Sequence, residues 1–377
     1  MFQGSSFHNG VNRDGPVPPL KLKWKFQTQG RIMTSPVVVD RVVYFGSRDG
    51  NIYALKLENG VLKWKYNIGF GGINHSIAID KTNNLLYTGS WTPLTSIGGH
   101  TKVGYHLYEF ALSKSEIIGK YKTGEIENVP PCVTVRNSTV YVNSDTILDD
   151  PKDKGKFKKQ FYILAIDSLS KNIKWKANLK GYTISPVTVD DKRIYVGTTD
   201  ENFVQAFDVE TGKLIWEYKT DGGIKSSPSL EGNYLYIASE DKYLYCLMSD
   251  SGKLNWKYLI GDKMVSTPAV LNGNKHIFVS TYNGRLQGFD GINLEPTWKF
   301  KIFKGFVSSP VINPKYVYIT GMDGYIYVLD INKGNLIWRY KVGDEITTSP
   351  AIAYEILFVS SDDGCLYAFE NINKENT

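Results

Sequence analysis

The sequence has few of the residues on which common catalytic and stabilising devices depend. Its cysteines number three, lie far apart and include no adjacent pair, which argues against a disulfide framework and favours buried thiols. It has five histidines, and it lacks the GxSxG and HExxH motifs and any glycine-rich phosphate loop. No class of catalysis is therefore indicated by a local motif.

Long apolar runs are also missing. No stretch approaches the roughly 20 apolar residues that a membrane helix requires, and the opening MFQGSSFHNG is not typical of a signal peptide. We expect a cytoplasmic protein if Met1 is the natural start, and an extracytoplasmic protein if a signal peptide has been removed. The net charge is a modest +6 with lysines spread along the chain, which argues against nucleic-acid binding.

Aromatic residues, valine, isoleucine and glycine are abundant instead, and they recur in a repeated unit. Seven tryptophans stand in one local phrase, typified by LKWKF and LKWKY. Neighbouring copies are 40 to 42 residues apart, except for one gap of 111 residues that holds two units and whose missing tryptophan is expected near Gly119. These seven residues are Trp24, Trp64, Trp175, Trp216, Trp256, Trp298 and Trp338.

Each unit reads as four short strands joined by tight polar turns. Residues 34–66 contain SPVVVD, VVYFGS, NIYALKL and VLKWKY, with Asp49-Gly50 supplying the positive φ of a hairpin turn. A four-stranded unit of about 40 residues that repeats around an axis is a propeller blade. We therefore predict an all-β fold, an eight-bladed β-propeller of four-stranded antiparallel blades. A β-solenoid is the alternative, but its coils are shorter and carry no recurring tryptophan.

The two ends of the chain predict how the ring closes. The last repeat lacks its tryptophan strand, whereas LKWKF near the N-terminus is a tryptophan strand with no blade before it. We expect residues 20–28 to complete the eighth blade, because this closure hides a free sheet edge. Residues 1–377 then form one propeller, with blades at about 34–69, 73–123, 128–179, 184–220, 226–260, 266–302, 308–342 and 348–371.

The recurring tryptophans are predicted to be structural. An indole at a blade edge can pack on the turn of the neighbouring blade and donate its N–H there. Their regular spacing is already explained by such blade-to-blade staples, which leaves no reason to assign any of them to a cofactor.

Two phrases resemble the repeat of pyrroloquinoline-quinone-type propellers. They are AFDVETGKLIW at residues 206–216 and SPVVVDRVVYFGSRDG at residues 35–50, and the resemblance extends from about Phe2 to Phe369. It implies the propeller fold and is poor guidance to an activity. One branch of the family comprises quinoprotein alcohol dehydrogenases, which bind the quinone and calcium on the axis. The other branch is not catalytic and includes an outer-membrane assembly lipoprotein.

This chain departs from both branches. It lacks the long insertions and the adjacent cysteines of the dehydrogenases, and it has no lipoprotein cysteine near the N-terminus. We therefore carry over the fold alone and expect no pyrroloquinoline quinone cofactor.

Two connections between a second and a third strand are expanded, and both are expected on one face of the ring. They are residues 91–106 in blade 2 and residues 145–160 in blade 3. The same face carries the loops that join one blade to the next, and it surrounds the axial opening. Inserted loops on one face of a repeat array indicate a functional face. The second insertion is rich in Asp and Lys, and we expect a solvated loop there.

Candidate binding residues gather on this axial face. Blade 2 holds three of the five histidines, and two glutamates precede the first strand of blade 3. Converging imidazoles and carboxylates bind a divalent metal or act as acid and base, although solvated loop residues are the simpler alternative because no local spacing fixes a ligand set. The metal alternative uses His75, His100 and His106. The candidates are Asn74, His75, Trp91, His100, His106, Glu125, Glu127, Asn128, Tyr182, Lys225, Lys263, Phe306 and Glu345.

The sequence thus predicts a monomeric, non-catalytic binding or scaffolding propeller. Its axial face is expected to hold a protein, a peptide or a small polar ligand, without cofactor. The first alternative is an enzyme with an axial acid/base site near His75, Glu125 and Glu127, with or without a divalent metal. The second is a quinone-dependent dehydrogenase, against which the missing insertions argue.

Overall fold

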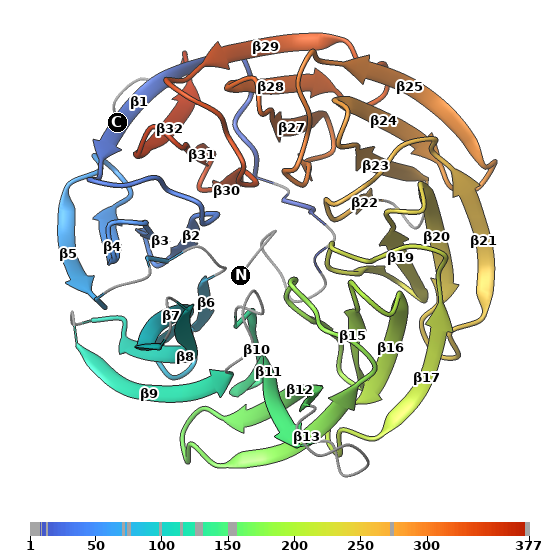
Figure 1. Cartoon of the computed structure of the whole chain (residues 1–377). Coiled ribbons are helices and arrows are strands. Elements are labelled where there is room, and N and C mark those ends of the chain that lie inside the picture. The colour runs from blue at the N-terminus through green and yellow to red at the C-terminus, as the bar shows by residue number, and fades with distance from the viewer. Residues whose placement is uncertain are drawn as a thin grey trace.

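Eight four-stranded antiparallel sheets surround a central axis, which confirms the predicted eight-bladed propeller (Figure 1). The computed structural model describes residues 8, 10–12, 14–69, 72–73, 77–97, 100–113, 116–124, 131–149, 157–271 and 275–373. In each sheet the first strand lies nearest the axis and the fourth strand forms the outer wall. Within the described residues, no helix is long and apolar enough to cross a membrane.

The first four blades contain the strands β2 to β17. Blade 1 comprises β2 (Val37–Val39), β3 (Val42–Gly46), β4 (Asn51–Lys56) and β5 (Leu62–Asn67). Blade 2 comprises β6 (Ile77–Asp80), β7 (Leu85–Ile97), β8 (His100–Ala111) and β9 (Ile117–Gly124). Blade 3 comprises β10 (Val133–Arg136), β11 (Thr139–Asp149), β12 (Phe157–Asp167) and β13 (Ile173–Leu179). Blade 4 comprises β14 (Thr188–Val189), β15 (Arg193–Gly197), β16 (Phe203–Asp208) and β17 (Leu214–Lys219).

The remaining blades contain β18 to β32 together with β1. Blade 5 comprises β18 (Ser229–Glu231), β19 (Tyr234–Ala238), β20 (Tyr243–Met248) and β21 (Leu254–Leu259). Blade 6 comprises β22 (Ala269–Leu271), β23 (His276–Ser280), β24 (Arg285–Asp290) and β25 (Glu295–Lys301). Blade 7 comprises β26 (Val311–Ile312), β27 (Tyr316–Thr320), β28 (Tyr325–Asp330) and β29 (Leu336–Lys341). Blade 8 comprises β30 (Ala351–Ala353), β31 (Ile356–Ser360), β32 (Cys365–Asn371) and β1 (Leu20–Gln27).

The N-terminal strand closes the ring, as predicted. β1 pairs antiparallel with β32, from Leu20 opposite Asn371 to Gln27 opposite Cys365. The sheet order β1-β32-β31-β30 therefore joins the two ends of the chain in one blade. This pairing removes the open edge that β32 would otherwise present.

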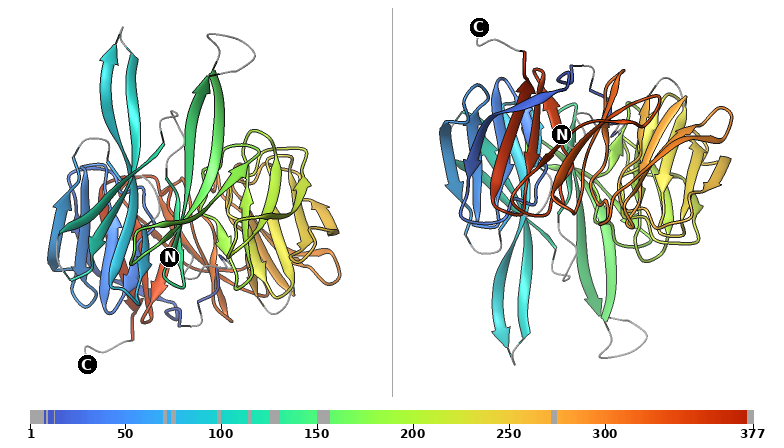
Figure 2. Two further views of the ribbon diagram at one scale, coloured as in Figure 1. Left: turned by 90° about the horizontal axis from the view of Figure 1, so that it is seen from below. Right: turned by 90° about the horizontal axis from the view of Figure 1, so that it is seen from above.

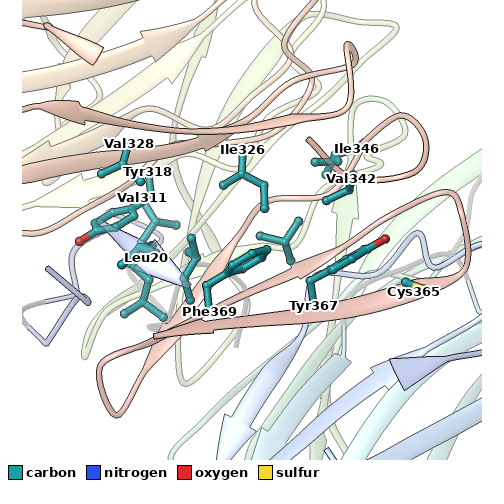
Figure 3. Close-up of a cluster of buried hydrophobic side chains, with 13 residues drawn as sticks. Leu20, Val311, Tyr318, Ile326, Val328, Val342, Ile346, Cys365, Tyr367 and Phe369 are labelled. Carbon is teal, nitrogen blue, oxygen red and sulfur yellow. The ribbon is translucent and has the colours of Figure 1, made fainter. Parts of the chain in front are cut away.

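The core lies between neighbouring blades rather than within one of them. The cluster between blades 7 and 8, for example, combines Val311 and Ile326 from one blade with Leu20 and Phe369 from the other (Figure 3). One blade is a single sheet, so it can cover its two apolar faces only by stacking on its neighbours. The inner strands are therefore covered on both faces, as in β3, whose five residues are all buried.

The tryptophan contacts support the predicted staples. The Nε1–H of Trp216 donates to the Ser249 carbonyl of the next blade at 3.0 Å. Its ring lies so close to Gly252 that a Cβ on that residue would fall 2.4 Å from the indole, so the turn requires glycine there. Four further indoles donate to the next blade, in the pairs Trp24–Leu57, Trp64–Leu112, Trp175–Val209 and Trp298–Ile331.

The two insertions differ from the irregular loops expected from the sequence. They lengthen the second and third strands, giving β7 of 13 residues and β8 of 12, and giving β11 and β12 of 11 residues each. The two resulting hairpins project from the same face of the ring, which we call the hairpin face (Figure 2). Regular backbone pairing between the inserted residues explains the difference, because it satisfies their amide groups without help from the ring.

Candidate functional site

The projecting halves of the two hairpins are two-stranded. β7 pairs with β6 only over Leu85–Thr88, although its pairing with β8 continues to Ile97. Likewise β11 pairs with β10 only over Thr139–Val142, although its pairing with β12 continues to Asp149. Beyond the ring, each hairpin therefore has strand edges that no further strand of its own sheet pairs with.

Some of these edges carry features that discourage indiscriminate pairing. Pro93 lies in the projecting part of β7, where the register with β8 also shifts between Pro93 and Thr95. Proline offers no amide hydrogen, and bulges twist an edge away from a flat partner. The projecting part of β12 begins with the sequence FKKQ, and lysines on an edge have the same protective effect.

An axial cavity of about 200 Å³ opens between the hairpin-face ends of the first strands. Its described lining is mostly hydroxyl and small apolar side chains from the Ser-Pro segments that begin the blades, with Lys225 as a charged member. The hydroxyls also tie the blades together. The amide of Ser309 donates to Ser349 Oγ at 2.8 Å, and the amide of Ser349 donates to Ser35 Oγ at 3.1 Å.

The N-terminal segment occupies part of the channel toward the opposite face. Gly10 and Asn12 exchange backbone hydrogen bonds of 2.8 Å with Ile312 of β26, so the segment adds to the inner edge of blade 7. His8 is 1% exposed and its Nδ1 lies 3.1 Å from Thr188 Oγ1 in blade 4. Burial lowers the pKa of His8 to about 3. The segment thus bridges inner strands of two separate blades.

The predicted rim residues of blades 4 to 8 differ in burial and in the groups that they contact. Lys225 lines the axial cavity and pairs with Glu240 at 3.0 Å. Tyr182 is half-buried, with its ring 5.9 Å from that of Phe161. Both remaining residues lie in the loops that join blades: Lys263 is exposed, and the half-buried Glu345 pairs with Lys304 at 2.7 Å. A ligand role for these residues stays a prediction.

The structure corrects the predicted binding role of Phe306. Its side chain is fully buried in the cluster of blades 6 and 7, with its ring 6.4 Å from that of Tyr327. It therefore packs in the core and cannot contact a ligand on the axial face. The sequence placed it in the correct loop, but the loop turns this side chain inward.

Most predicted residues of blades 2 and 3 cannot be placed. Asn74, His75, Glu125, Glu127 and Asn128 lie outside the described residues, as do the side chains of Trp91 and His100.

Among the three histidines predicted to bind a metal, His106 is the one whose side chain the structure describes. It is half-buried in β8, and its pKa is lowered by burial and by the ammonium groups of Lys120 and Lys122. Two neighbouring positive charges make its surroundings unfavourable for a metal cation. No group of three or more His, Cys, Asp or Glu side chains that could hold a metal occurs among the described residues. The metal site stays a prediction, because two of its three histidines fall outside them.

Two exposed aromatic residues on the hairpin face were missed by the sequence analysis. Phe303 is 99% exposed in the loop between β25 and β26, and Tyr282 is 54% exposed in the turn between β23 and β24. The loop packs on the turn, because the Ile302 amide donates to the Gly284 carbonyl at 2.8 Å. A signal existed in the repeat, since the position equivalent to Phe303 is glycine or a polar residue in every other loop, as in Gly69 and Gly261.

The interface between blades 2 and 3 replaces the tryptophan staple by polar groups. Gly119 stands in β9 where a tryptophan stands in the other outer strands, and Glu109 lies opposite it where other blades have a small residue. Lys171 of blade 3 takes the turn position of the usual glycine, with φ of 64°. Its ammonium group forms an ion pair with the fully buried Glu109 carboxylate.

Two tyrosine hydroxyls complete this polar cluster, which we call the Glu109 cluster. Tyr121 Oη donates to Glu109 Oε2 at 2.8 Å, and Tyr87 Oη lies 3.3 Å from Oε1. A carboxylate taken out of water requires such partners, because an unpaired buried charge is costly. The Glu109 cluster therefore takes the space of the missing indole and joins the two blades that carry the hairpins.

Comparison with known proteins identifies the family. The family model described as outer membrane protein assembly factor BamB matches residues 131–226, 204–305 and 295–375, which is more than half of the chain. The chain belongs to this family. The resemblance to pyrroloquinoline-quinone-type propellers is thereby confirmed.

Individual relatives of this BamB family member include an assembly factor and enzymes. The outer membrane protein assembly factor BamB of Moranella endobia is 24% identical over 80% of this chain and 76% of its own length. The tetrathionate hydrolase of Acidithiobacillus ferrooxidans is 23% identical over 68% of this chain, which spans only 51% of that enzyme. A europium-containing methanol dehydrogenase has the same fold, with a TM-score of 0.81, 13% identity and coverage of 98% of this chain and 97% of its own.

The axial lining of this BamB family member does not suit a calcium-bound quinone. Calcium requires several carboxylate and carbonyl oxygens. The described lining of the axial cavity contains no Asp or Glu, and its charged member is Lys225. The described residues therefore do not fit the group, and no reaction step through it is derived.

Proposed function

We propose that this protein is a non-catalytic scaffold that binds a protein partner on its hairpin face. The observation that carries the proposal is the pair of projecting hairpins in adjacent blades, both on one face (Figure 2). Strand edges held away from the ring offer backbone groups to an extended segment of a partner. The ring itself is a rigid base, because its blades are joined by buried clusters and staples.

The exposed aromatic residues support the same face. Phe303 and Tyr282 lie on blades 6 and 7, across the axial opening from the hairpins of blades 2 and 3. Exposed aromatic side chains on a rigid loop are typical anchors of protein interfaces. A partner that contacts both regions would cover the mouth of the axial cavity. The relatives that are described as assembly factors are consistent with a binding role of this kind.

Hairpin exchange and site-specific crosslinking test the proposal. Residues 90–106 and 144–162 are replaced by SRDGN, the segment that joins the equivalent strands of blade 1 at residues 47–51. A photo-crosslinking residue is placed at position 303, and in a matched control at position 292. Ile292 is 64% exposed in the β24–β25 turn, at the opposite end of blade 6. Crosslinking is carried out in extracts of the source cells.

We expect one recurrent crosslinked protein at position 303 that is absent at position 292 and lost in the exchanged variant. Equal crosslinking at both positions would contradict the proposal. So would a partner that is still captured after both hairpins have been shortened, provided that the variant melts like the wild type.

The axial cavity supports a second candidate, an enzyme with an acid/base site. The lining is polar, and one relative is described as a hydrolase. The described thiol in the cavity is a poor nucleophile, because burial raises the pKa of Cys132 to about 12. The acid and base of such an enzyme would therefore have to be His75, Glu125 and Glu127. Stoichiometric metal in the purified protein that is lost from His75→Ala would favour this candidate over the scaffold.

A further inference from the structure

Positive charge is unevenly distributed around the outer wall of the ring. The four outer strands β1, β5, β9 and β13 follow one another through blades 8, 1, 2 and 3 (Figure 1). They contain no Asp or Glu. The other four outer strands contain two glutamates and six basic residues. The lysines of the first group are Lys21, Lys23, Lys25, Lys63, Lys65, Lys120, Lys122, Lys174 and Lys176.

Most of this charge faces solvent. All the lysines of β5, β9 and β13 are exposed, and so is Lys25 of β1. Lys23 is partly neutralised by Glu370 at 2.6 Å, and Lys174 lies 3.6 Å from Asp167. Lys120 and Lys176 lie over tyrosine rings of the adjacent strands, which orients their ammonium groups without removing the charge. We call this sector, made of β1, β5, β9 and β13, the basic wall.

Exposed aliphatic side chains accompany the lysines in a regular row. Leu22, Leu62, Ile118 and Ile173 are 36%, 39%, 47% and 58% exposed, one on each strand of the basic wall. Each lies within two residues of a lysine on its own strand. The wall therefore presents ammonium groups and aliphatic groups on the outer strands of four consecutive blades of the eight.

We propose that the basic wall binds an anionic lipid surface, with the lysines on the headgroups and the aliphatic row at the boundary with the acyl chains. A basic surface is attracted to anionic lipids, and apolar side chains among the lysines add binding by burial at that boundary. Lysine stems can also lie along apolar material while their ammonium groups stay in the headgroup layer. The proposal concerns the side of the ring and is independent of the partner on the hairpin face.

The aliphatic row is what favours lipid over a nucleic acid or another soluble polyanion. A polyanion is bound through charge and through stacking on aromatic side chains. The row on the basic wall is aliphatic, and the aromatic rings beneath Lys120 and Lys176 are already covered by these lysines. Aliphatic groups at that spacing add nothing to a phosphate backbone, but they match a lipid boundary.

Vesicle flotation with matched charge variants tests the proposal. The probe is extruded vesicles of equal parts phosphatidylglycerol and phosphatidylcholine, with pure phosphatidylcholine as the uncharged comparison. The test variant is K25Q/K65Q, which changes the residue after the tryptophan in blades 8 and 1. The control variant is K257Q/K299Q, which changes the same repeat position in blades 5 and 6. Both variants lower the net charge of the full-length protein by the same amount.

We expect salt-sensitive binding to the anionic vesicles and weak binding to the uncharged ones. K25Q/K65Q should weaken binding about 25-fold, which corresponds to roughly fivefold for each lysine near an anionic surface. K257Q/K299Q should change it less than threefold. Equal losses in both variants would overturn the proposal in favour of diffuse attraction by net charge, and an absence of binding at 50 mM salt would overturn it outright.

A third variant, Leu62→Asn, separates lipid from polyanion. It should weaken vesicle binding several-fold and leave retention on heparin unchanged, because only lipid uses the aliphatic row. Heparin binding that responds to K25Q/K65Q as strongly as vesicle binding does, together with no effect of Leu62→Asn on vesicles, would assign the basic wall to a soluble polyanion and refute the lipid proposal.

Discussion

The Glu109 cluster offers the sharpest single test of how blades 2 and 3 are held together. Lys171→Met removes the ammonium group and keeps the length and most of the apolar stem of the side chain. Lys171 is 33% exposed, whereas the Glu109 side chain is fully buried, so the carboxylate rather than the lysine is stranded by the change. The perturbation therefore isolates the cost of an unpaired negative charge between two blades.

The magnitude follows from what remains around the carboxylate. Removing one partner of a buried ion pair costs about 3–5 kcal/mol. The hydroxyls of Tyr121 and Tyr87 stay in place at 2.8 and 3.3 Å and continue to solvate the charge. We therefore expect a loss at the lower end, about 3 kcal/mol at pH 7.

Urea unfolding at pH 7, followed by tryptophan fluorescence, measures the effect. The control is Lys304→Met, because the Lys304–Glu345 pair has a similar separation of 2.7 Å but both side chains are substantially exposed. It should destabilise the protein far less than Lys171→Met, because water and salt screen an exposed pair. The triple variant E109A/G119W/K171G rebuilds the usual staple and should recover the stability that Lys171→Met loses.

A loss of less than 1 kcal/mol for Lys171→Met at pH 7 would refute this reasoning, because Glu109 would then be stabilised by other groups.

Two further predictions concern the staples and the N-terminal segment. Trp216→Ala should cost about 3–5 kcal/mol in urea unfolding because the indole is 8% exposed, whereas its neighbour Ile215→Ala, 45% exposed, should cost less than about 1 kcal/mol; similar losses would argue against a staple. His8→Gln should flatten the acid sensitivity of stability, because the folded pKa of His8, about 3, lies below its ordinary value of 6.5 and the wild type therefore loses stability as the pH falls through this range. Parallel pH profiles of melting for variant and wild type would contradict the burial of His8.

The fold could be predicted from the sequence because the same four-stranded unit recurs along it many times. Seven copies carry the same tryptophan and most carry the same turn glycines, so the period and the number of strands can be read from agreement among the copies. Closure followed from a missing strand at one end and a surplus strand at the other. Such features depend on local spacing, which a sequence records directly.

The candidate site was less predictable because it depends on the directions of single side chains. Phe303 and Phe306 stand in the same loop, and only the packing against Tyr327 decides that Phe306 is buried and Phe303 is exposed. The N-terminal segment was not foreseen in the channel, because its pairing with Ile312 joins residues at opposite ends of the chain by two hydrogen bonds. A pairing between residues so far apart in the chain produces no local pattern in the sequence.

The departures from the repeat are concentrated in one part of the ring, and this concentration is itself informative. Blades 4 to 7 keep short hairpins, and each keeps its tryptophan. Blades 2 and 3 carry both projecting hairpins and the Glu109 cluster, and they continue the basic wall. A symmetric ring gains nothing in stability from replacing one staple by a buried ion pair, since well-packed apolar groups serve at least as well. The replacement is better explained if the spacing or orientation of the two hairpins matters, because the Glu109 cluster fixes the blades that bear them through directional bonds. On this reasoning E109A/G119W/K171G should fold well and yet bind the hairpin-face partner less tightly than the wild type.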